Sequence, residues 1–409
     1  MERNEYLAYK EKLHTRGIVP GLSNMEKMLS IINGLPSKCN YIHIAGTNGK
    51  GSVGAFISSC LSVSGYKTAH YYSPAIEDYT DNIKINCENL NEEKYLFYAE
   101  KLINILEKHK DFLPTEFEFE TGLFFTVLKE EKCDFAVIEC GMGGMWDATN
   151  VIPSPLVSVL TPISMEHSKF LGSTIEDITR QKAGIIKNSK AFSSPQCKEA
   201  ATVLEEYGVN FVDNKDIKNI FYNDNNTVFD YKDIKDINIY LKGKYQCENA
   251  TITIEVMKFL KEKGFDTDIK RGLESTHWHY RFEEICHSPT VILDGAHNPA
   301  AFESLKENIK LYFNNKKVLL VMGVFKDKDY NSMLKTIAEV TDTLVAVDTQ
   351  GERGLEGRVL AKKAKEYIKN LSICENVTEV IGHIEKYAYD VLIYAGSFSF
   401  LAKVRKNYE

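Results

Sequence analysis

The stretch Tyr41-Ile42-His43-Ile44-Ala45-Gly46-Thr47-Asn48-Gly49-Lys50-Gly51-Ser52 decides the fold of this chain of 409 residues. It opens with an apolar run that predicts a buried β-strand, and residues 53–63 continue in a helical pattern. The turn between them lets backbone N–H groups face phosphates, and the N-terminus of the helix attracts their charge. Lysine reaches the outer phosphates and the serine hydroxyl ligates Mg²⁺. The stretch therefore predicts a phosphate-binding loop.

The strict pattern G-x-x-x-x-G-K-[ST] is not met, because Gly51 separates Lys50 from Ser52. The alternative is a glycine-rich turn between strand and helix that binds nothing. That alternative leaves the lysine and the serine unexplained.

Two further apolar strands lead to groups that suit a metal. The run Phe135–Glu139 ends in a carboxylate before the flexible turn at residues 140–144, and residues 156–160 lead to Glu166 and His167. We expect these side chains at the edge of the sheet beside the phosphate loop, where Mg²⁺ takes oxygen ligands. The alternatives are an exposed glutamate at an ordinary strand end and a structural histidine.

Two more motifs lie at predicted turns. Lys182 stands ahead of Ala-Gly-Ile, where a plain helix-end residue is the alternative. The segment DGAHNP, from Asp294 to Pro299, directly follows a strand. It places an acid and a histidine where ligand sites form in α/β proteins, although a turn without a ligand is also open.

Apolar runs alternate with amphipathic helical segments over most of the chain, which predicts parallel sheets with helices on their faces. We expect an α/β protein. A phosphate-loop ATPase domain with a mostly parallel sheet would span residues 1–285, and a smaller doubly wound α/β domain would span residues 286–409. The second domain has no G-x-G-x-x-G, so a dinucleotide role has no support. The predicted strands are 41–45, 134–140, 156–160, 290–293, 318–322, 344–347 and 391–394, with small strands at 226–229 and 237–241.

Composition argues against several classes of protein. The net charge of -7 disfavours a general nucleic-acid or membrane-surface binder. No apolar run reaches the roughly 18 residues of a membrane span, and Met1–Glu5 lack the apolar core of a signal peptide. The nine cysteines are scattered without a C-x-x-C pair, as in reduced cytosolic proteins. We expect a cytoplasmic protein that binds neither nucleic acid nor a membrane.

Taken together, the motifs resemble those of the Mur ligase superfamily, and within it the folylpolyglutamate/dihydrofolate synthases. The resemblance runs from about residue 20 to the C-terminus, and its segments stand in the family's order across both domains. They are the loop 46–52; ECGMGGMWDATN at 139–150, similar to E-x-G-L-G-G-R-x-D-A-T-N; residues 171–187, similar to L-G-x-T leading to K-A-G-I-I-K; DGAHNP at 294–299; GVFKDKD at 323–329, similar to G-x-x-x-D-K-D; and Gly396-Ser397.

The resemblance implies a role for each matching residue. The implied catalytic residues are Lys50, Lys182 and His297, and Lys182 matches the lysine that this family commonly carbamylates. The implied metal ligands are Ser52, Glu139, His167 and, once carbamylated, Lys182. The implied ATP-binding residues are Gly46, Thr47, Asn48, Gly49, Lys50, Gly51, Ser52, Asn249, Arg281, Asp294 and His297. The implied acceptor-binding residues are Ser73, Pro74, Thr115, Phe117, Glu118, Asp147 and Asn150.

The chain departs from the family pattern mainly on the acceptor side. Ala75 replaces the histidine of Ser-Pro-His-Leu, and Met145 replaces the arginine of G-L-G-G-R. Asp81-Asn82 stand where E-R-I-x-I-N has its first two residues. Gln181 replaces the acid before the carbamylated lysine, and Tyr245 replaces the histidine of H-Q-x-x-N-A. The pattern therefore supports ligase chemistry more strongly than it supports folate as the substrate.

The resemblance implies an ATP-dependent ligase that activates an acid as an acyl phosphate and joins it to L-glutamate. ATP and Mg²⁺ would be the cofactors, a folate-type acid the acceptor, and the protein a monomer. One alternative is a Mur-superfamily ligase that acts on a non-folate acid. Others are an ATPase or phosphotransferase that forms no amide and a nucleotide-binding regulatory protein without turnover. A requirement of ADP release for both an acid and an amino acid separates the ligase from these last two.

Overall fold

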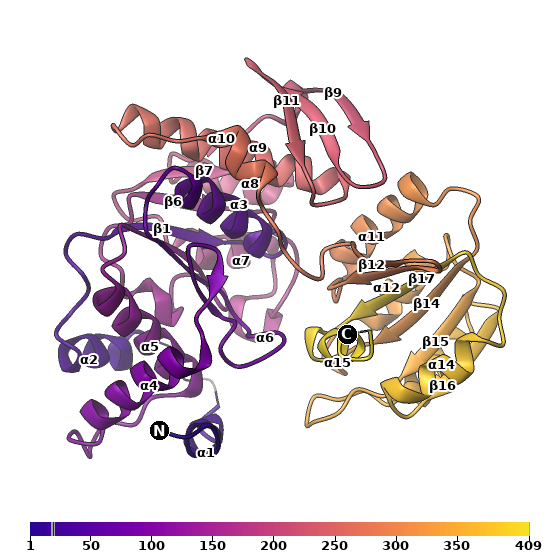
Figure 1. The fold of residues 1–409 in the computed structure, drawn as a ribbon, viewed down its shortest axis with the longest axis horizontal. Coiled ribbons are helices and arrows are strands. Elements are labelled where there is room, and N and C mark those ends of the chain that lie inside the picture. Colours follow the sequence, from indigo (N-terminus) through magenta and orange to yellow (C-terminus); the bar gives the residue numbers. More distant parts are fainter. Residues whose placement is uncertain (18, 20, 409) are drawn as a thin grey trace. The chain divides into compact units, whose positions relative to one another are not determined.

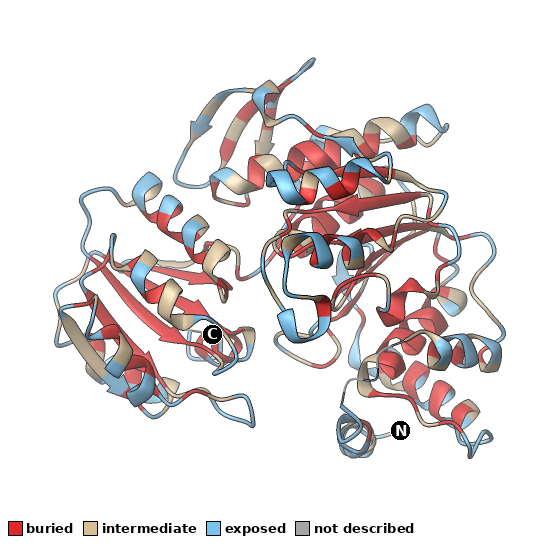
Figure 2. Cartoon of the chain, turned by 180° about the vertical axis from the view of Figure 1, so that it is seen from behind, coloured by how far each residue is buried: buried red, intermediate tan, exposed pale blue. Residues whose placement is uncertain are grey.

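The computed structural model describes residues 1–17, 19 and 21–408, which form two compact units (Figure 1). Unit 1 comprises Met1–Lys218, Asp230–Ile237 and Glu248–Thr276, and unit 2 comprises Asn219–Phe229, Asn238–Cys247 and His277–Glu409. The central strands of both large sheets are buried (Figure 2). Burial on both faces is typical of parallel sheets covered by helices, so the predicted architecture is confirmed.

The frame of unit 1 is an eight-stranded sheet in the order β4-β3-β2-β5-β1-β6-β7-β8. It is parallel from β2 to β8, and β3 and β4 join antiparallel at one edge. Its strands are β1 (Asn40–Ala45), β2 (Thr68–Tyr71), β3 (Ile83–Ile85), β4 (Glu88–Asn89), β5 (Phe135–Glu139), β6 (Val157–Leu160), β7 (Lys190–Ser193) and β8 (Asn210–Phe211). The three strands predicted in this part of the chain, β1, β5 and β6, are adjacent.

Helices cover this sheet. The helix that follows β1, α3 (Lys50–Val63), is buried along nearly its whole length, from Gly51 to Leu61. The other helices are α1 (Arg3–His14), α2 (Ser23–Ile31), α4 (Glu92–Leu106), α5 (Glu116–Glu131), α6 (Ser168–Leu171), α7 (Ile175–Ala183), α8 (Lys198–Glu205), α9 (Lys244–Glu262) and α10 (Ile269–Glu274), with short 3-10 turns at η1 (Ala148–Val151) and η2 (Asn214–Asp216). The first four residues of α9, Lys244–Cys247, belong to unit 2.

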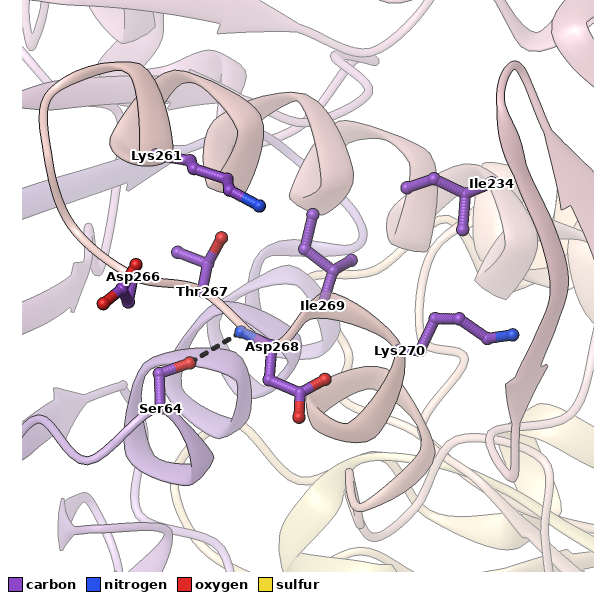
Figure 3. Close-up of a pocket in the computed structure, with 8 residues that line it drawn as sticks. All are labelled: Ser64, Ile234, Lys261, Asp266, Thr267, Asp268, Ile269 and Lys270. Atoms are coloured by element: carbon purple, nitrogen blue, oxygen red, sulfur yellow. Dashed lines mark hydrogen bonds between the residues drawn. The ribbon is translucent and has the colours of Figure 1, made fainter.

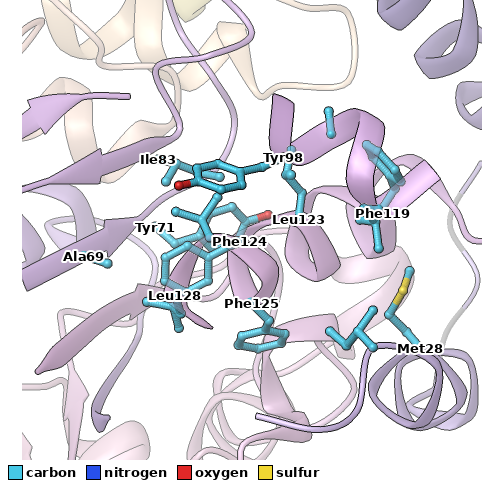
Figure 4. Packing of buried hydrophobic residues seen from close by; sticks show 14 of the residues in the cluster. Met28, Ala69, Tyr71, Ile83, Tyr98, Phe119, Leu123, Phe124, Phe125 and Leu128 are labelled. Carbon is cyan, nitrogen blue, oxygen red and sulfur yellow. The ribbon is translucent and has the colours of Figure 1, made fainter. Parts of the chain in front are cut away.

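The largest aromatic contribution to this core comes from α5, where Phe119, Leu123, Phe124 and Phe125 are fully buried (Figure 4). The Phe124 ring stacks on that of Tyr71, on β2, with ring centroids 4.8 Å apart. Aromatic side chains of this size bury 150–250 Å² each. The α5–β2 contact therefore anchors the helix against the sheet.

A separate three-stranded sheet has the order β11-β10-β9. Its strands are β9 (Ile217–Tyr222), β10 (Thr227–Tyr231) and β11 (Ile234–Ile239). The small strands predicted at 226–229 and 237–241 correspond to β10 and β11.

Unit 2 contains a six-stranded sheet in the order β12-β13-β17-β14-β15-β16. All neighbours are parallel except β12 and β13. Its strands are β12 (Glu283–His287), β13 (Thr290–Asp294), β14 (Val318–Gly323), β15 (Thr343–Val347), β16 (Asn370–Cys374) and β17 (Val391–Gly396), and its helices are α11 (Pro299–Tyr312), α12 (Tyr330–Ile337), α13 (Gly357–Ala364), α14 (Val380–Ile384) and α15 (Phe398–Arg405), with η3 at Val377–Glu379. The four strands predicted here are all present.

The predicted domain limit at residues 285/286 falls inside β12, and the described units change over between Thr276 and His277. Among the helices that the structure describes, none combines the length and the apolar character needed to cross a bilayer.

Candidate active site

The predicted phosphate loop lies at the carboxyl end of β1, whose neighbours in the sheet are β5 and β6. Gly46 has φ +154°, and a Cβ there would lie 1.9 Å from Thr161 Oγ1. Gly49 has φ +88°, and its Cβ would lie 2.8 Å from Asn249 Oδ1. Only glycine fits such positions without strain. The structure thus brings Asn249, which is far away in the sequence, against the loop where the resemblance places ATP.

Lys50 is the first residue of α3 and curls over its own loop. Its Nζ donates to the carbonyl oxygens of Gly46 at 3.1 Å and Thr47 at 3.2 Å. It also lies 3.7 Å from Glu139 Oε1. The ammonium is therefore held at the mouth of the loop, where a helix N-terminus favours anions.

Glu139 ends β5, and Ile44 of β1 is its partner in the parallel ladder. Its side chain is only 9% exposed. Ser52 is buried in the first turn of α3. A hydroxyl and a carboxylate are the oxygen ligands that Mg²⁺ prefers, so the donors present here suit that ion.

His167 differs from these two residues. It is exposed, it has φ +46°, and it precedes the short helix α6. Imidazole nitrogen is a poorer ligand for Mg²⁺ than oxygen. Among the described residues, no group of three or more His, Cys, Asp or Glu side chains is arranged to hold a metal.

Lys182 is the most deeply buried charged group of the site, with a side chain 1% exposed. Its Nζ donates to Glu166 Oε1 at 2.6 Å and to the Gly46 carbonyl at 2.8 Å. Burial alone would raise the pKa of Glu166, but the charges of Lys182 and Lys50 bring it down to about 2. The lysine is thus paired with an acid, and it reaches the carbonyl of Gly46 in the predicted phosphate loop.

The loop that contains Glu166 is fastened to the phosphate loop. Thr47 Oγ1 donates to the Ser164 carbonyl at 3.1 Å and accepts the Ser164 N–H at 3.0 Å. Gln196 accepts from the N–H of Ile163 at 2.9 Å and donates to the Thr161 carbonyl at 3.1 Å. These hydrogen bonds hold the backbone at residues 161–164, just before Glu166, and so help to position the Glu166 carboxylate against Lys182.

Two of the predicted acceptor residues form the N-terminal cap of α5. Thr115 Oγ1 accepts the Glu118 N–H at 3.3 Å, and Glu118 Oε2 accepts the Thr115 N–H at 2.7 Å. This reciprocal arrangement is a capping box. Phe117 lies between them in sequence, and its ring is so close to Gly141 that a Cβ there would meet it at 2.6 Å.

Asp147 and Asn150 are also engaged within the protein. Asp147 accepts the N–H groups of Met142 at 2.8 Å and Thr149 at 3.0 Å. Asn150 Nδ2 donates to the carbonyls of Met145 and Gly184, each at 3.1 Å. Both side chains shape the loop at residues 141–147.

The segment of Ser73 and Pro74 leads into a turn organised by Asp81. The Asp81 carboxylate accepts the N–H of Ile76 at 3.0 Å and that of Glu77 at 2.7 Å. Burial raises the pKa of Asp81, and these N–H groups oppose the rise. The Asp81 carboxylate therefore holds this turn in place through the backbone N–H groups of residues 76 and 77.

Three predicted ATP-binding residues gather at the carboxyl edge of the unit 2 sheet. Asp294 ends β13 and accepts the N–H groups of Ala296 at 2.8 Å and Phe282 at 3.0 Å, while burial raises its pKa to about 6. The Arg281 guanidinium carbon lies 4.9 Å above the Phe398 ring, and the Arg281 side chain closely approaches Gly295. His297 Nδ1 lies 2.8 Å from the carbonyl oxygen of Gly295, to which it donates.

A surface hollow elsewhere in unit 1 is a different feature (Figure 3). It is lined by Ser64, Ile234, Lys261 and residues 266–270. Ser64 follows the last residue of α3, whereas Lys50 begins that helix. Fourteen helical residues span about 21 Å, so this hollow is not the phosphate site.

Two protein-family models match the chain. The Mur ligase middle domain matches residues 44–257, and the glutamate ligase domain of Mur ligases matches residues 280–398. The chain is 32% identical to the dihydrofolate synthase/folylpolyglutamate synthase of Bacillus subtilis, over 96% of this chain and 95% of that protein. The chain belongs to the folylpolyglutamate/dihydrofolate synthase family of Mur ligases.

Solved structures of this family share the fold. A Mycobacterium tuberculosis folylpolyglutamate synthase complexed with ADP and AMPPCP is similar with a TM-score of 0.90 at 24% identity, covering 100% of this chain and 99% of that one. The FolC protein of Escherichia coli, in complex with DHPP and ADP, is similar with a TM-score of 0.86 at 27% identity, covering 99% and 97%. The α/β class and the family predicted from the sequence are confirmed.

The structure also shows two features that the motifs did not reveal. Glu166 was expected at this edge of the sheet, but its pairing with Lys182 was not predicted, because the two residues lie on different elements. Gln196 gave no signal, because a glutamine in an irregular segment is typical of any surface loop.

Proposed function

We propose that this chain is an ATP-dependent ligase that adds L-glutamate to a folate-type acid, giving ADP and phosphate. A carboxylate oxygen of the acid attacks the γ-phosphorus of ATP, and the bond to ADP breaks. The glutamate amine then attacks the acyl carbon of the resulting acyl phosphate, phosphate leaves, and the amine loses a proton. The single observation that carries the proposal is the convergence of Lys50, Glu139 and Lys182 on the loop at Gly46.

In the first step the chain supplies charge and position. With ATP bound, Lys50 Nζ would exchange its contacts with the Gly46 and Thr47 carbonyls for phosphate oxygens. The N–H groups at residues 46–52 and the N-terminus of α3 would hold the remaining phosphate charge. Such electrostatic stabilisation is the main protein contribution to phosphoryl transfer.

We propose Ser52 and Glu139 as ligands of Mg²⁺, which would neutralise charge on the transferred group. Their hydroxyl and carboxylate oxygens suit the ion, and both are held by elements that flank the loop. His167 stays a predicted third ligand. Its exposure and αL conformation make it the weakest of the set.

Lys182 stays a predicted site of carbamylation. A carbamate would convert the buried cation into an anion, which Glu166 at 2.6 Å would then repel. The modification therefore requires Glu166 to turn away or to share a cation with the new group. Unmodified Lys182 would act as a cation beside Gly46, and either form is consistent with a catalytic role.

In unit 2 we propose ATP-binding roles for Arg281, Asp294 and His297, with His297 also catalytic. The guanidinium supplies positive charge, and Asp294 and His297 supply polar groups at the strand edge where α/β ligand sites form. The predicted limits of the two domains, 1–285 and 286–409, stay part of this proposal.

For the acceptor we propose Ser73, Pro74, Phe117, Asp147 and Asn150 as the nearest groups, with the Thr115–Glu118 cap holding Phe117 in place. The loop at 141–147 presents Met145 and an exposed Trp146. A flat aromatic acid suits such a surface because aromatic groups stack with one another.

We further propose that the protein acts in the cytoplasm as a monomer on small molecules, without nucleic-acid or membrane partners. All nine cysteines are free, which suits a reducing compartment. The net charge of -7 disfavours nucleic acid as a partner.

The proposal is tested by incubating the protein with ATP, Mg²⁺ and a panel of folate-type and non-folate acids, each with and without L-glutamate. ADP release is measured, and mass spectrometry identifies the product. Amide product from folate-type acids supports the proposal. If only the non-folate acids give an amide product, the protein is a ligase but the proposed folate-type acceptor is wrong. ADP release without any amide product would show that the protein is not a ligase.

A further inference from the structure

A chain of hydrogen bonds runs beneath the loop that follows β5. His43, on β1, is fully buried, and its Nε2 lies 2.8 Å from Thr149 Oγ1 and 3.1 Å from Cys140 Sγ. Thr149 Oγ1 lies 2.6 Å from Asp147 Oδ1, and Asp147 Oδ2 accepts the Met142 N–H at 2.8 Å. The chain thus connects the central strand to both ends of the loop at 141–147.

The chemistry of the groups fixes the direction of these bonds. An ionised carboxylate only accepts, so the single proton of the Thr149 hydroxyl points to Asp147. The hydroxyl oxygen must then accept from His43, whose Nε2 therefore carries a proton. Burial lowers the pKa of His43 to about 3, so the ring is neutral near pH 7 and its Nδ1 carries no proton.

His43 Nδ1 is buried and has no hydrogen-bond partner among the residues described. A buried polar atom without a partner destabilises a fold, and an apolar side chain of similar size would avoid that loss. The polar contacts of this ring are therefore those of Nε2, with Thr149 and Cys140. Of these two contacts, the one with Thr149 leads on to Asp147 and the loop.

The loop at 141–147, which these hydrogen bonds hold, is part of the proposed acceptor site. It contains Asp147 and the exposed Trp146, and the N–H of Met145 donates to the Gln181 carbonyl at 2.6 Å, next to Lys182. A site is precise only when the groups behind it are fixed. The loop is thus bonded to Thr149 through Asp147 and to the end of α7 through Met145.

We propose that His43 is a positioning residue for the ligase reaction, which acts through Thr149 and Asp147 to keep the loop at 141–147 in the shape that receives the acid. The inference rests on the proposed function for the identity of the ligand. The hydrogen bonds by which His43 holds the loop through Thr149 and Asp147 do not depend on that function.

Three variants test the role of the Nε2 proton. Glutamine places an amide N–H near the position of Nε2, whereas asparagine reaches only the position of Nδ1, and leucine has no donor. We expect His43→Leu and His43→Asn to raise the KM for the acid about tenfold, the effect of one lost buried hydrogen bond. In His43→Gln we expect the KM for the acid to return most of the way to the wild-type value. The KM for ATP should be unchanged in all three variants. Val159→Ala, a cavity in the neighbouring strand β6, controls for general loosening of the core.

A second measurement needs no turnover. The chain has two tryptophans, of which Trp146 is 55% exposed and Trp278 is 8% exposed. In a Trp278→Phe background the fluorescence anisotropy of Trp146 reports the order of the loop. We expect lower anisotropy in His43→Leu and His43→Asn, and recovery in His43→Gln. Thr149→Val, which keeps the shape and loses the hydroxyl, should behave like His43→Leu and should add nothing to it in the double variant.

Equal behaviour of the glutamine and asparagine variants, in both KM and anisotropy, would overturn the proposal. So would an unchanged acid KM together with unchanged anisotropy in His43→Leu. If the wild-type protein ligates none of the acids, the proposed function fails, and the anisotropy measurement still decides whether His43 holds the loop.

Discussion

Replacing Glu166 with glutamine tests how strongly the buried ion pair with Lys182 stabilises unit 1. Lys182 is 1% exposed, and the two charged groups lie 2.6 Å apart. Burial opposes ionisation of Glu166, but Lys182 and Lys50 move its pKa from 4.5 to about 2. A shift of that size corresponds to about 3 kcal/mol. For a domain of roughly 150–250 residues, this loss lowers the unfolding temperature by about 6–12 °C.

The sign of the pH dependence follows from the same pKa. The folded-state value lies below the unfolded value, so the stabilisation is complete above about pH 4.5 and is lost as the pH falls toward about 2. The unfolding temperatures of wild type and Glu166→Gln should therefore differ by a constant amount near neutral pH. This difference in temperature should become smaller in acid.

The matched control is Glu206→Gln. Glu206 pairs with Arg180 at 2.7 Å on α7, but both side chains are about half exposed, at 51% and 48%. Exposed ion pairs contribute little, so this variant should unfold almost as wild type does. An unfolding temperature of Glu166→Gln that matches the control at neutral pH would refute the reasoning.

Variants at three other positions test the site. Lys50→Ala should lower kcat/KM more than tenfold and weaken ATP binding in a titration, since the cation at the loop is lost; retention of more than about a tenth of the activity, a loss under about 1.4 kcal/mol, would contradict the phosphate loop. Lys182→Ala should lose most activity and Lys182→Glu should regain part of it, with carbon-13 bicarbonate NMR as the check for a carbamate; a fully active Lys182→Ala without a carbamate signal in wild type would end that assignment. Asp294, whose pKa burial raises to about 6, should make unit 2 less stable as the pH rises from about 4 to about 6, because its folded-state pKa lies above the unfolded value. Asp294→Asn should lack this decline in unfolding temperature, and an identical pH profile in the two proteins would exclude Asp294 as its source.

The sequence predicted the elements whose signals are local. Long apolar runs such as Val318–Met322 stand out because a strand buried on both faces needs them. The short strands β2 and β3 were not predicted, since four and three residues give little periodicity. The helix α3 begins at Lys50, three residues before the predicted start at Val53, because the end of the glycine-rich loop forms the first turn.

The site was predictable where its residues lie in one motif, and not where they meet from different elements. Lys182 was singled out, but its partner Glu166 depends on how α7 packs against the loop after β6. Thr115 and Glu118 match family positions, and the structure gives them a second task as the cap of α5. His43 gave no signal at all, because a histidine inside an apolar strand reads as one more core residue.

The measurement that tests the central claim most directly follows oxygen from the acid. An acid labelled with oxygen-18 in its carboxylate is incubated with the protein, ATP, Mg²⁺ and L-glutamate, and the released phosphate is analysed by mass spectrometry. If the carboxylate attacks the γ-phosphorus and the amine later displaces phosphate, one labelled oxygen leaves with each phosphate released. Phosphate that carries no label, with amide formed, would contradict an acyl phosphate and with it the account of this site.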